Sequence, residues 1–160
     1  DGGPLFIVQE RIGEGNKIVK ILKFRSMIRD DRGDYAAAGD SNTVTKVGHF
    51  LRKSRIDELP QLWNVLKGDL SLIGPRPELP ALARKYSEEI PYYNVRHLVR
   101  PGLSGWAQIY HDRHPHHGAD TEETKNKLSY DLYYIKNRSF LLDIKIALRT
   151  LKTLISMAGR

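Results

Sequence analysis

The chain has 160 residues, about the size of one domain, and its 26 lysines and arginines against 19 acidic residues give a net charge of +7. A hydrophobic content of 40% excludes an intrinsically disordered chain, and the absence of cysteine excludes a disulfide framework, a zinc ribbon and a thiol nucleophile. The basic balance predicts an anionic partner: a nucleic acid, a lipid headgroup surface or a phosphorylated substrate.

Membrane-spanning and targeting segments are not predicted. No apolar run approaches the roughly 18 residues that a spanning helix needs, and the start of the chain does not resemble a signal peptide. The sequence begins at Asp1 and runs directly into an apolar strand pattern, so we expect a further segment upstream.

The first predicted elements are the two strands of a β-hairpin. Residues Pro4 to Ile12 and Ile18 to Met27 favour strands, and the run GEGNK between them suits a tight reversal. The next stretch, Ile28 to Asn42, is rich in Asp, Gly and Ala without sustained periodicity and predicts an exposed loop.

Two helices are predicted next. The pattern is helical from Thr43, and we divide it before Pro60, which a first turn tolerates but a helix interior does not. The second helix then runs from about Asp57 to Gly68, which places Asp57 near a helix N-terminus. The apolar face of the first helix comprises Val47, Phe50 and Leu51.

Proline and glycine divide the middle of the chain. Leu72 to Pro77 (LIGPRP) predicts a loop, and Glu78 to Ile90 predicts a helix ended by Pro91. Val99 to Gln108 (VRPGLSGWAQ) contains too many breakers for a regular element and predicts a structured loop.

Two helices complete the chain, over Thr121 to Lys136 and Ser139 to Met157. The last one has a wide apolar face opposite basic residues, and such a helix packs on a core or lies in a membrane interface; the pattern alone favours the core. A hairpin followed by helices, without internal repeats, predicts an α+β fold in one domain, residues 1–160. The apolar face comprises Phe140, Ile144, Leu148, Leu151, Leu154 and Ile155.

Adjacent carboxylates, Asp57 and Glu58, follow three cations, Arg52, Lys53 and Arg55. The ordinary explanation is a solvated helix start, where acidic residues complement the helix dipole. Alternatively, the cations and the helix N-terminus hold Asp57 ionised as a nucleophile toward phosphorus or an acetal carbon. Successive helical residues point about 100° apart, so one carboxylate can attack while the other binds a metal or handles a proton.

Several cations are candidates for binding phosphate. Arg76 lies between two prolines, which fixes the backbone around a guanidinium able to make two parallel hydrogen bonds to phosphate. Lys23 and Arg25 alternate on a strand and share one face, and with Arg52, Arg76 and Arg100 they form a predicted electropositive pocket for a diphosphate. Incidental solvated cations are the ordinary alternative.

Other polar and aromatic residues have ordinary explanations. A polar loop is preferred to a zinc site for the histidine cluster, because Pro115 interrupts helical spacing. Asp131 with Lys127 one turn earlier predicts a surface ion pair, and Trp106 and Tyr110 are predicted to pack. The cluster comprises His111, His114, His116 and His117.

Four motifs in order closely resemble the bacterial sugar transferase family, the monotopic phosphoglycosyltransferases. They are KFRSM at 23–27, RIDELPQLWNVLKGDLSLIGPRPE at 55–78, RPGLSGWAQ at 100–108 and YDLYYIKNRSFLLDIKI at 130–146. The resemblance covers nearly the whole chain. It implies transfer of a phosphosugar from a UDP-sugar to a polyprenol phosphate such as undecaprenyl phosphate, releasing UMP, as the first membrane step of exopolysaccharide, capsule or O-antigen-type lipopolysaccharide synthesis.

The resemblance also implies roles for single residues. Asp57 looks like the nucleophile that forms a covalent phosphosugar intermediate, and Glu58 like its partner; both are expected to hold Mg²⁺. Asp131 matches the acidic position of the family's DxYY segment. The residues expected to bind substrate are Lys23, Arg25, Arg52, Arg76, Arg100 and Asp131.

A covalent intermediate would let a soluble donor and a lipid acceptor use one pocket in turn, so the active site is expected at a bilayer surface. This makes interfacial seating of the last helix at least as favoured as core packing. The resemblance implies an upstream hydrophobic anchor and a catalytic domain on the cytoplasmic face of the bacterial inner membrane, and leaves a homo-oligomer open.

Two other classes of protein remain as alternatives. A nucleic-acid-binding domain predicts interleaved basic and aromatic residues on a groove-reading element, which the sequence does not contain, so no nucleic acid partner is expected. A non-catalytic membrane-surface scaffold predicts loss of the carboxylate pair or of the GPRP arginine, whereas Asp57, Glu58 and Arg76 are all present.

Overall fold

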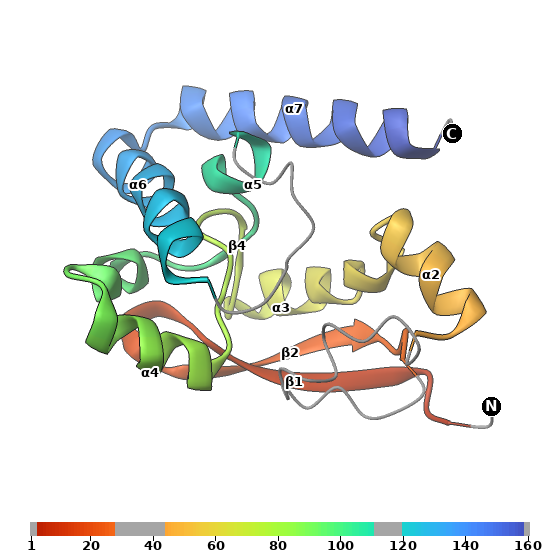
Figure 1. Cartoon of the computed structure of the whole chain (residues 1–160). Helices are drawn as coiled ribbons and strands as arrows, with labels where there is room; N and C mark the ends of the chain where they lie inside the picture. The colour runs from red at the N-terminus through yellow and green to blue at the C-terminus, as the bar shows by residue number, and fades with distance from the viewer. Residues whose placement is uncertain (1–2, 28–43, 111–119, 159–160) are drawn as a thin grey trace.

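The computed structural model describes residues 3–27, 44–110 and 120–158. An N-terminal antiparallel hairpin, β1 (Phe6–Ile12) and β2 (Ile18–Phe24), is followed by helices and a small parallel sheet of β3 (Ser71–Ile73) and β4 (Gly102–Ser104), as Figure 1 shows. The predicted α+β class is confirmed. The helices are α2 (Lys46–Lys53), α3 (Gln61–Lys67), α4 (Pro80–Glu89), α5 (Trp106–Tyr110), α6 (Thr121–Asn137) and α7 (Phe140–Ala158).

The hairpin confirms the prediction for the first 27 residues. Its register runs from the pair Phe6 and Phe24 to the pair Ile12 and Ile18. A short 3₁₀ turn, η1 (Glu14–Asn16), reverses the chain, and both Gly15 (φ 66°) and Asn16 (φ 61°) adopt the left-handed conformation that glycine and asparagine tolerate best. The loop predicted over 28–42 and the histidine cluster lie outside the described residues.

The helix predicted from Asp57 to Gly68 is two elements. A three-residue 3₁₀ turn, η3 (Ile56–Glu58), follows Arg55, which is left-handed at φ 57°, and α3 begins only at Gln61. The division follows from Pro60, which lacks an N–H and precedes the first helical residue. Asp57 therefore lies in a tight turn and not at the N-terminus of an α-helix, which corrects the prediction.

Two segments were predicted as loops, Leu72 to Pro77 and Val99 to Gln108. The structure has regular elements there: the parallel strands β3 and β4 and the start of the short helix α5. Ser71 pairs with Gly102 and Ile73 with Ser104. Their glycines permit close contact: a Cβ on Gly74 would lie 2.6 Å from the carbonyl oxygen of Arg100. The breakers that argued against regular structure are thus the residues that let two backbones approach.

The main core lies between α4, α6 and the 3₁₀ segment η4 (Tyr93–Leu98). The helices predicted over 78–90 and 121–136 are confirmed as α4 and α6, with bounds shifted by one or two residues. Side chains from all three elements meet in this core, which supports the loop after β3 from one side. The buried residues are Ala83, Tyr86, Ile90, Tyr93 and Leu128.

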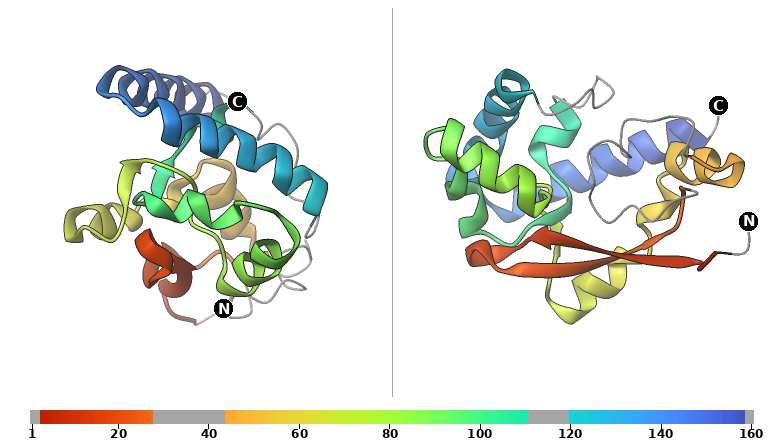
Figure 2. Two further views of the ribbon diagram at one scale, coloured as in Figure 1. Left: turned by 90° about the vertical axis from the view of Figure 1, so that its left-hand side faces the viewer. Right: turned by 60° about the horizontal axis from the view of Figure 1, so that its bottom comes forward.

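Helix α7 lies on the side of the molecule opposite the hairpin, with α3 and the small parallel sheet between them (Figures 1 and 2). Among the side chains of α7 whose burial the structure describes, only Ile146 is fully buried, at 0% exposure. The predicted apolar face points outward: Phe140 is 79% exposed, Leu148 62% and Ile155 66%. The core packing favoured by the pattern alone is therefore wrong.

Helices α2 and α3 also expose apolar side chains. Val47 and Phe50 of α2 are 67% and 65% exposed, and Trp63 and Leu66 of α3 are 63% and 81% exposed. The apolar face predicted for the first of these two helices thus exists on α2, but Val47 and Phe50 leave it mostly uncovered. Among the described residues, no helix combines the length and apolar character that crossing a membrane requires.

Candidate active site

The turn η3 brings the two adjacent carboxylates to strand β2 and to the loop that follows β3. Arg76 in that loop donates two parallel hydrogen bonds to Glu58, one of them 3.3 Å from Nη1 to Oε2. Lys23 on β2 places its Nζ 3.9 Å from Glu58 Oε1. The Glu58 carboxylate is therefore held between two cations in a pocket where its side chain is 15% exposed.

Charge and burial act strongly on this cluster. Burial alone would raise the pKa of Glu58, but the charge and hydrogen bond of Arg76 and the charge of Lys23 outweigh it and lower that pKa to about 2. Burial lowers the pKa of Lys23 to about 8, with the charges of Arg11 and Arg76 acting in the same direction. Glu58 is therefore ionised throughout the physiological pH range, and the pKa of Lys23 lies unusually close to that range.

Asp57 differs from its neighbour. In the part of the chain that the structure describes, its half-buried carboxylate accepts no hydrogen bond and forms no ion pair. Burial and the charge of Glu58 raise the pKa of Asp57, and Lys23, Arg76 and Arg52 only partly oppose them. We predicted that cations and a helix N-terminus would favour ionisation; the direction of the pKa shift is the opposite, because burial and Glu58 dominate.

The loop bearing Arg76 is anchored through its carbonyls. Its two prolines cannot donate, and three donors reach the carbonyl oxygens of the loop instead. Gly102 N donates to the Pro75 oxygen over 2.9 Å, Arg96 Nη2 to the Arg76 oxygen over 2.8 Å, and Arg11 Nη1 to the Pro77 oxygen over 3.3 Å. The Arg76 backbone is thus fixed from the sheet, from η4 and from the hairpin.

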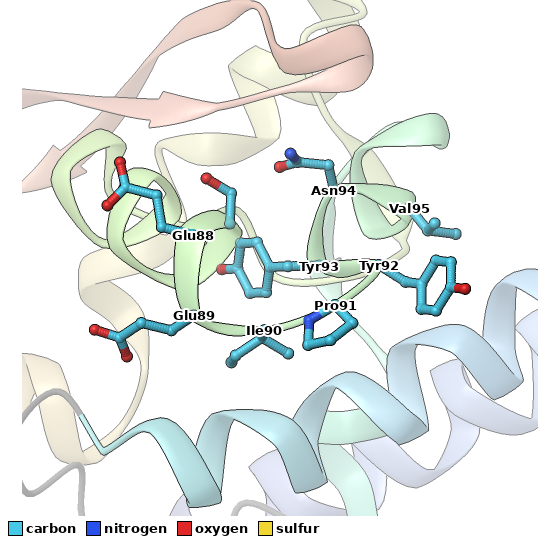
Figure 3. A pocket seen from close by; sticks show the side chains of 9 residues that line it. Glu88, Glu89, Ile90, Pro91, Tyr92, Tyr93, Asn94 and Val95 are labelled. Carbon is cyan, nitrogen blue, oxygen red and sulfur yellow. The ribbon is translucent and has the colours of Figure 1, made fainter.

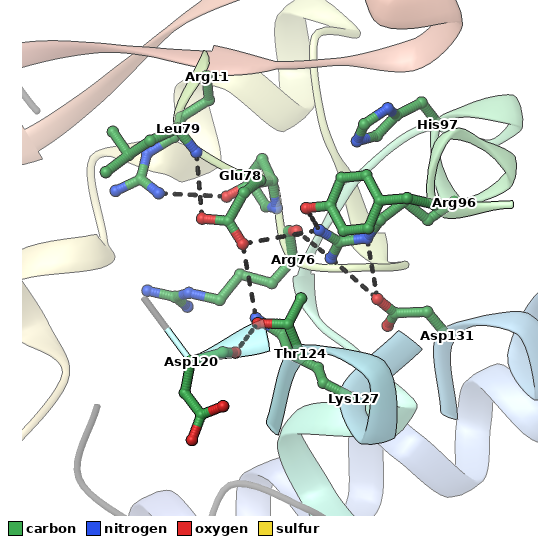
Figure 4. A network of polar contacts seen from close by, with 12 residues as sticks. Arg11, Arg76, Glu78, Leu79, Arg96, His97, Asp120, Thr124, Lys127 and Asp131 are labelled. Atoms are coloured by element: carbon green, nitrogen blue, oxygen red, sulfur yellow. Dashed lines mark hydrogen bonds and ion pairs between the residues drawn. The ribbon is translucent and has the colours of Figure 1, made fainter. Parts of the chain in front are cut away.

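Behind the loop lies a second cluster of charges, drawn in Figure 4. Arg96 forms an ion pair of 2.9 Å with Asp131, and both side chains are 2% exposed. Glu78 lies 3.7 Å from Arg96 and 3.9 Å from Lys127. The predicted surface pair of Asp131 with Lys127 is therefore wrong: Asp131 is buried and pairs with Arg96, while Lys127 pairs with Glu78.

The structure assembles only part of the predicted cationic pocket. Lys23 and Arg76 meet at Glu58, and Arg52 acts on the pKa of Asp57 through its charge. Arg25 donates instead to the Pro4 carbonyl over 2.8 Å, and Arg100, 48% exposed, pairs with Glu14 at 3.7 Å. The prediction that Arg25 and Arg100 join Lys23 in one cationic pocket is therefore wrong.

The aromatic residues behave as predicted. Trp106 stacks on Tyr133 with ring centroids 5.3 Å apart and lies 4.2 Å from Tyr110, so both predicted aromatics pack between α5, α6 and α7. Lys145 and Arg149 of α7 lie over these rings. The cluster holds the short helix α5 against α7.

A surface hollow of about 290 Å³ lies at residues 87–95, where α4 passes into η4 (Figure 3). Glu88, Glu89 and Tyr92 line it, and none of its lining residues is a lysine or arginine. Its charge does not suit a diphosphate. The carboxylate pair with its two cations remains the site whose chemistry suits phosphate.

Sequence reasoning missed Arg11, Glu78, Tyr93 and Arg96. Arg96 stands in the ordinary run YNVRHLV, and only its burial, at 3% exposure, distinguishes it from a surface arginine. Arg11 lies on β1, and its side chain donates to the carbonyl oxygen of Pro77, 66 residues further along the chain. No local sequence pattern predicts either contact, because both depend on how distant segments of the chain pack together.

A divalent cation would find one carboxylate available here. In residues 3–27, 44–110 and 120–158, no three His, Asp or Glu side chains gather as a ready metal site. Mg²⁺ commonly uses one or two protein carboxylates and completes its shell with water and substrate phosphates. The unpaired Asp57, with Glu58 adjacent, fits that mode of binding.

Together, an unpaired carboxylate and two cations beside it define a site suited to nucleophilic chemistry on a phosphate. A family model described as bacterial sugar transferase matches residues 1–157, and the chain belongs to this family. The likeness extends over the whole described site, so the predicted resemblance is confirmed.

Similar proteins carry names that agree with the family. Over 160 residues the chain is 48% identical to a UDP-N-acetylgalactosamine-undecaprenyl-phosphate N-acetylgalactosaminephosphotransferase of Aeromonas hydrophila, covering 98% of this chain and 37% of that protein. Over 158 residues it is 45% identical to a UDP-glucose:undecaprenyl-phosphate glucose-1-phosphate transferase of Caulobacter vibrioides, covering 96% and 58%. Over 160 residues it is 41% identical to the uncharacterized sugar transferase EpsL of Bacillus subtilis, covering 99% and 73%. The chain thus spans less than two thirds of the length of the first two of these relatives.

Proposed function

We propose that this chain transfers a sugar phosphate from a UDP-sugar to undecaprenyl phosphate, with Asp57 as the nucleophile. The observation that carries the proposal is the half-buried Asp57 carboxylate, which has no hydrogen bond or ion pair within the described residues and feels the charges of Lys23 and Arg76. A raised pKa makes a carboxylate a stronger base, and so a better nucleophile once it is ionised. The names of the relatives support both substrates.

Two displacements at phosphorus would complete the reaction. An Asp57 oxygen attacks the β-phosphorus of the UDP-sugar, and the bond from that phosphorus to the bridging oxygen breaks, so that UMP leaves with the electron pair. A phosphate oxygen of undecaprenyl phosphate then attacks the same phosphorus and releases the Asp57 carboxylate. The product is undecaprenyl-diphosphate-sugar, and no oxidant or further reactant is needed.

Glu58 would act as the partner of the nucleophile. Its carboxylate now accepts two hydrogen bonds from Arg76, in the geometry with which arginine binds a phosphate group. A donor diphosphate would compete for Arg76 and Lys23 and so loosen Glu58. Arg52 would add positive potential near Asp57, as it does in the free protein.

We include Mg²⁺ in the proposal. Asp57 and Glu58 would hold it together with oxygens of the donor diphosphate, which suits the small number of protein carboxylates that this ion takes. When bound, Mg²⁺ would neutralise negative charge on the diphosphate as UMP departs.

The outward apolar faces support a membrane surface as the second partner. Leu148 and Leu151 of α7 are 62% and 54% exposed, and the exposed Lys152 on the same helix would face anionic headgroups. Replacing both leucines with serine is expected to weaken binding to phosphatidylglycerol vesicles by about tenfold or more. Undiminished sedimentation with vesicles would contradict this seating.

Intact-mass spectrometry tests the function directly. The chain is mixed with Mg²⁺ and a panel of UDP-sugars, and a mass increase equal to one sugar phosphate is expected with the true donor, with release of UMP. Asp57→Asn is expected to form no adduct, whereas Glu88→Gln, on the surface of α4, serves as the matched control. An adduct on another residue, or full turnover by Asp57→Asn, would refute the role of Asp57.

A non-catalytic scaffold at the membrane would need neither an unpaired buried carboxylate nor an arginine fork beside it. Burying an unpaired carboxylate costs free energy, so such an arrangement is kept where it performs chemistry. Binding to vesicles together with no adduct for any UDP-sugar would favour the scaffold.

A further inference from the structure

We infer that Arg96 and Asp131 are positioning residues: their buried ion pair fixes the backbone of Arg76 and so aims its guanidinium at the phosphate site. The kinetic consequence of this inference rests on the proposed function. Asp131 then acts without touching the donor, unlike the direct contact that family resemblance implied, since its side chain is 2% exposed.

The Arg96 guanidinium donates hydrogen bonds to three partners: Asp131, Tyr93 and the carbonyl of Arg76. Nε and Nη2 lie 3.0 Å and 2.9 Å from Asp131 Oδ2, and Nη1 donates to the Tyr93 hydroxyl over 2.9 Å. Nη2 also donates to the Arg76 carbonyl over 2.8 Å. Because the guanidinium is planar and rigid, fixing its other donors fixes the direction of the bond to Arg76.

This bond matters because it reaches the carbonyl of Arg76 itself, whereas the donors Gly102 N and Arg11 Nη1 reach the carbonyls of the two flanking prolines. Pro75 and Pro77 have no N–H to donate, so the loop is attached mainly through its carbonyl oxygens. The side chain of Arg76 reaches Glu58. One hydrogen bond and the length of Arg76 thus connect the buried pair to the carboxylate cluster.

Asp131 is the residue that keeps Arg96 in this orientation. Without its charge, the nearest described carboxylate for Arg96 is Glu78, at 3.7 Å, which is already shared with Lys127 at 3.9 Å. Arg96 would turn toward Glu78 and draw away from the Arg76 carbonyl. Since an error of about 1 Å in a reacting group can cost about 100-fold in rate, such a shift has a measurable effect.

A double-mutant cycle on the full chain tests the inference through the rate of sugar-phosphate adduct formation. Asp131→Asn is expected to slow the reaction by about 10- to 100-fold when Arg76 is present, but by less than about threefold in the Arg76→Gln background. Leu128→Ala, in the same helix and buried in the main core, is the control for lost stability and is expected to leave the rate within about twofold at a temperature where every variant is folded.

Two results would overturn the inference. One is that the effects of Asp131→Asn and Arg76→Gln multiply; the other is that Leu128→Ala, at an equal loss of Tm, slows the reaction as much as Asp131→Asn does. If Asp131→Asn fails to fold, Tyr93→Phe replaces it in the cycle, because it removes one hydrogen bond to Arg96 with little change in volume.

Hydrogen exchange gives a readout that does not need catalysis. In Asp131→Asn, the amides of residues 73–79 are expected to exchange faster than in the unaltered chain, whereas Leu128→Ala leaves them unchanged relative to the rest of the core. If the unaltered chain forms no adduct with any UDP-sugar, the proposed function fails, and the exchange rates alone decide the positioning role. Equal exchange in both variants would refute it.

Discussion

Two clusters of carboxylates lie on either side of the Arg76 loop, and they differ in how completely they are paired. In the inner cluster, Glu78 and Asp131 each face a cation, and their side chains are 13% and 2% exposed. In the outer cluster, Glu58 is paired with Arg76 and Lys23, but Asp57 is not paired within the described part of the chain. The same residue types are thus paired throughout in one place and, among the described residues, only partly paired in the other.

The pKa directions do not simply follow the two clusters. Burial alone would raise the pKa of each carboxyl, and the charges of neighbouring cations outweigh it at Glu78 and at Glu58, so those two pKa values are lowered. At Asp131 burial prevails despite the ion pair with Arg96, and at Asp57 burial and the charge of Glu58 prevail, so both pKa values are raised. Asp57 differs from Asp131 in having no ion-pair partner among the described residues.

The largest expected contrast is in stability. Asp131→Leu leaves the buried charge of Arg96 without its main partner and is expected to lower the free energy of unfolding by about 3–5 kcal/mol. Asp57→Leu breaks no hydrogen bond or ion pair and relieves repulsion with Glu58, so it is expected to change that free energy by less than about 1 kcal/mol, or to raise it. Urea denaturation measures both, and equal losses would contradict the comparison.

The acid dependence of unfolding separates the two members of the outer cluster. The pKa of Glu58 is about 2 in the folded chain, below its ordinary value of 4.5, so its contribution of about 3 kcal/mol is present above pH 4.5 and is lost as the pH falls toward 2. Glu58→Gln is expected to remove this part of the acid destabilisation. The measurement is urea denaturation at several pH values between about 5 and 2.

Asp57 is expected to act with the opposite sign in the same experiment. Its pKa is raised on folding, so the folded chain binds that proton more readily than the unfolded chain and gains stability as the pH falls. Asp57→Asn removes this gain and is expected to make the loss of stability in acid steeper. A shallower loss in Asp57→Asn would show that the assigned direction is wrong.

The smallest expected effect on stability comes from Arg76→Lys. The backbone carbonyl that accepts from Arg96 is retained, but the two parallel hydrogen bonds to Glu58, and the same fork for a phosphate, are lost. We expect kcat/KM for the UDP-sugar to fall by about 10- to 100-fold, while Tm changes little. An unchanged kcat/KM would show that Arg76 acts only as a point charge.

Periodicity and turn residues predicted the hairpin and the helices α4, α6 and α7 closely. The Asp57–Glu58 pair and the GPRP arginine were singled out from their neighbouring residues and from the family motifs, and their roles stay predictions. The parallel strands β3 and β4 were missed, since strands of only three residues, next to glycine and proline in the sequence, show no alternation of their own. Their pairing depends on contact between residues about 30 positions apart.

The site residues divide in the same way. Lys23 and Arg76, predicted to belong to a cationic pocket for a diphosphate, lie beside Glu58, but Arg25 and Arg100 have basic side chains of the same kind and lie elsewhere. Charge along a sequence does not tell which cation meets which anion. That is decided by packing, which also put Asp131 on Arg96 across 35 residues.

The sequence by itself determined the local elements, the family and the residue types of the site, because helical and strand periods, prolines and glycines act within a few residues. Only the tertiary structure decided that Asp57 has no partner among the described residues, that Asp131 is buried and that the apolar face of α7 points outward. These properties depend on burial and on partners from distant segments, and a side chain acquires both only when the chain has folded around it.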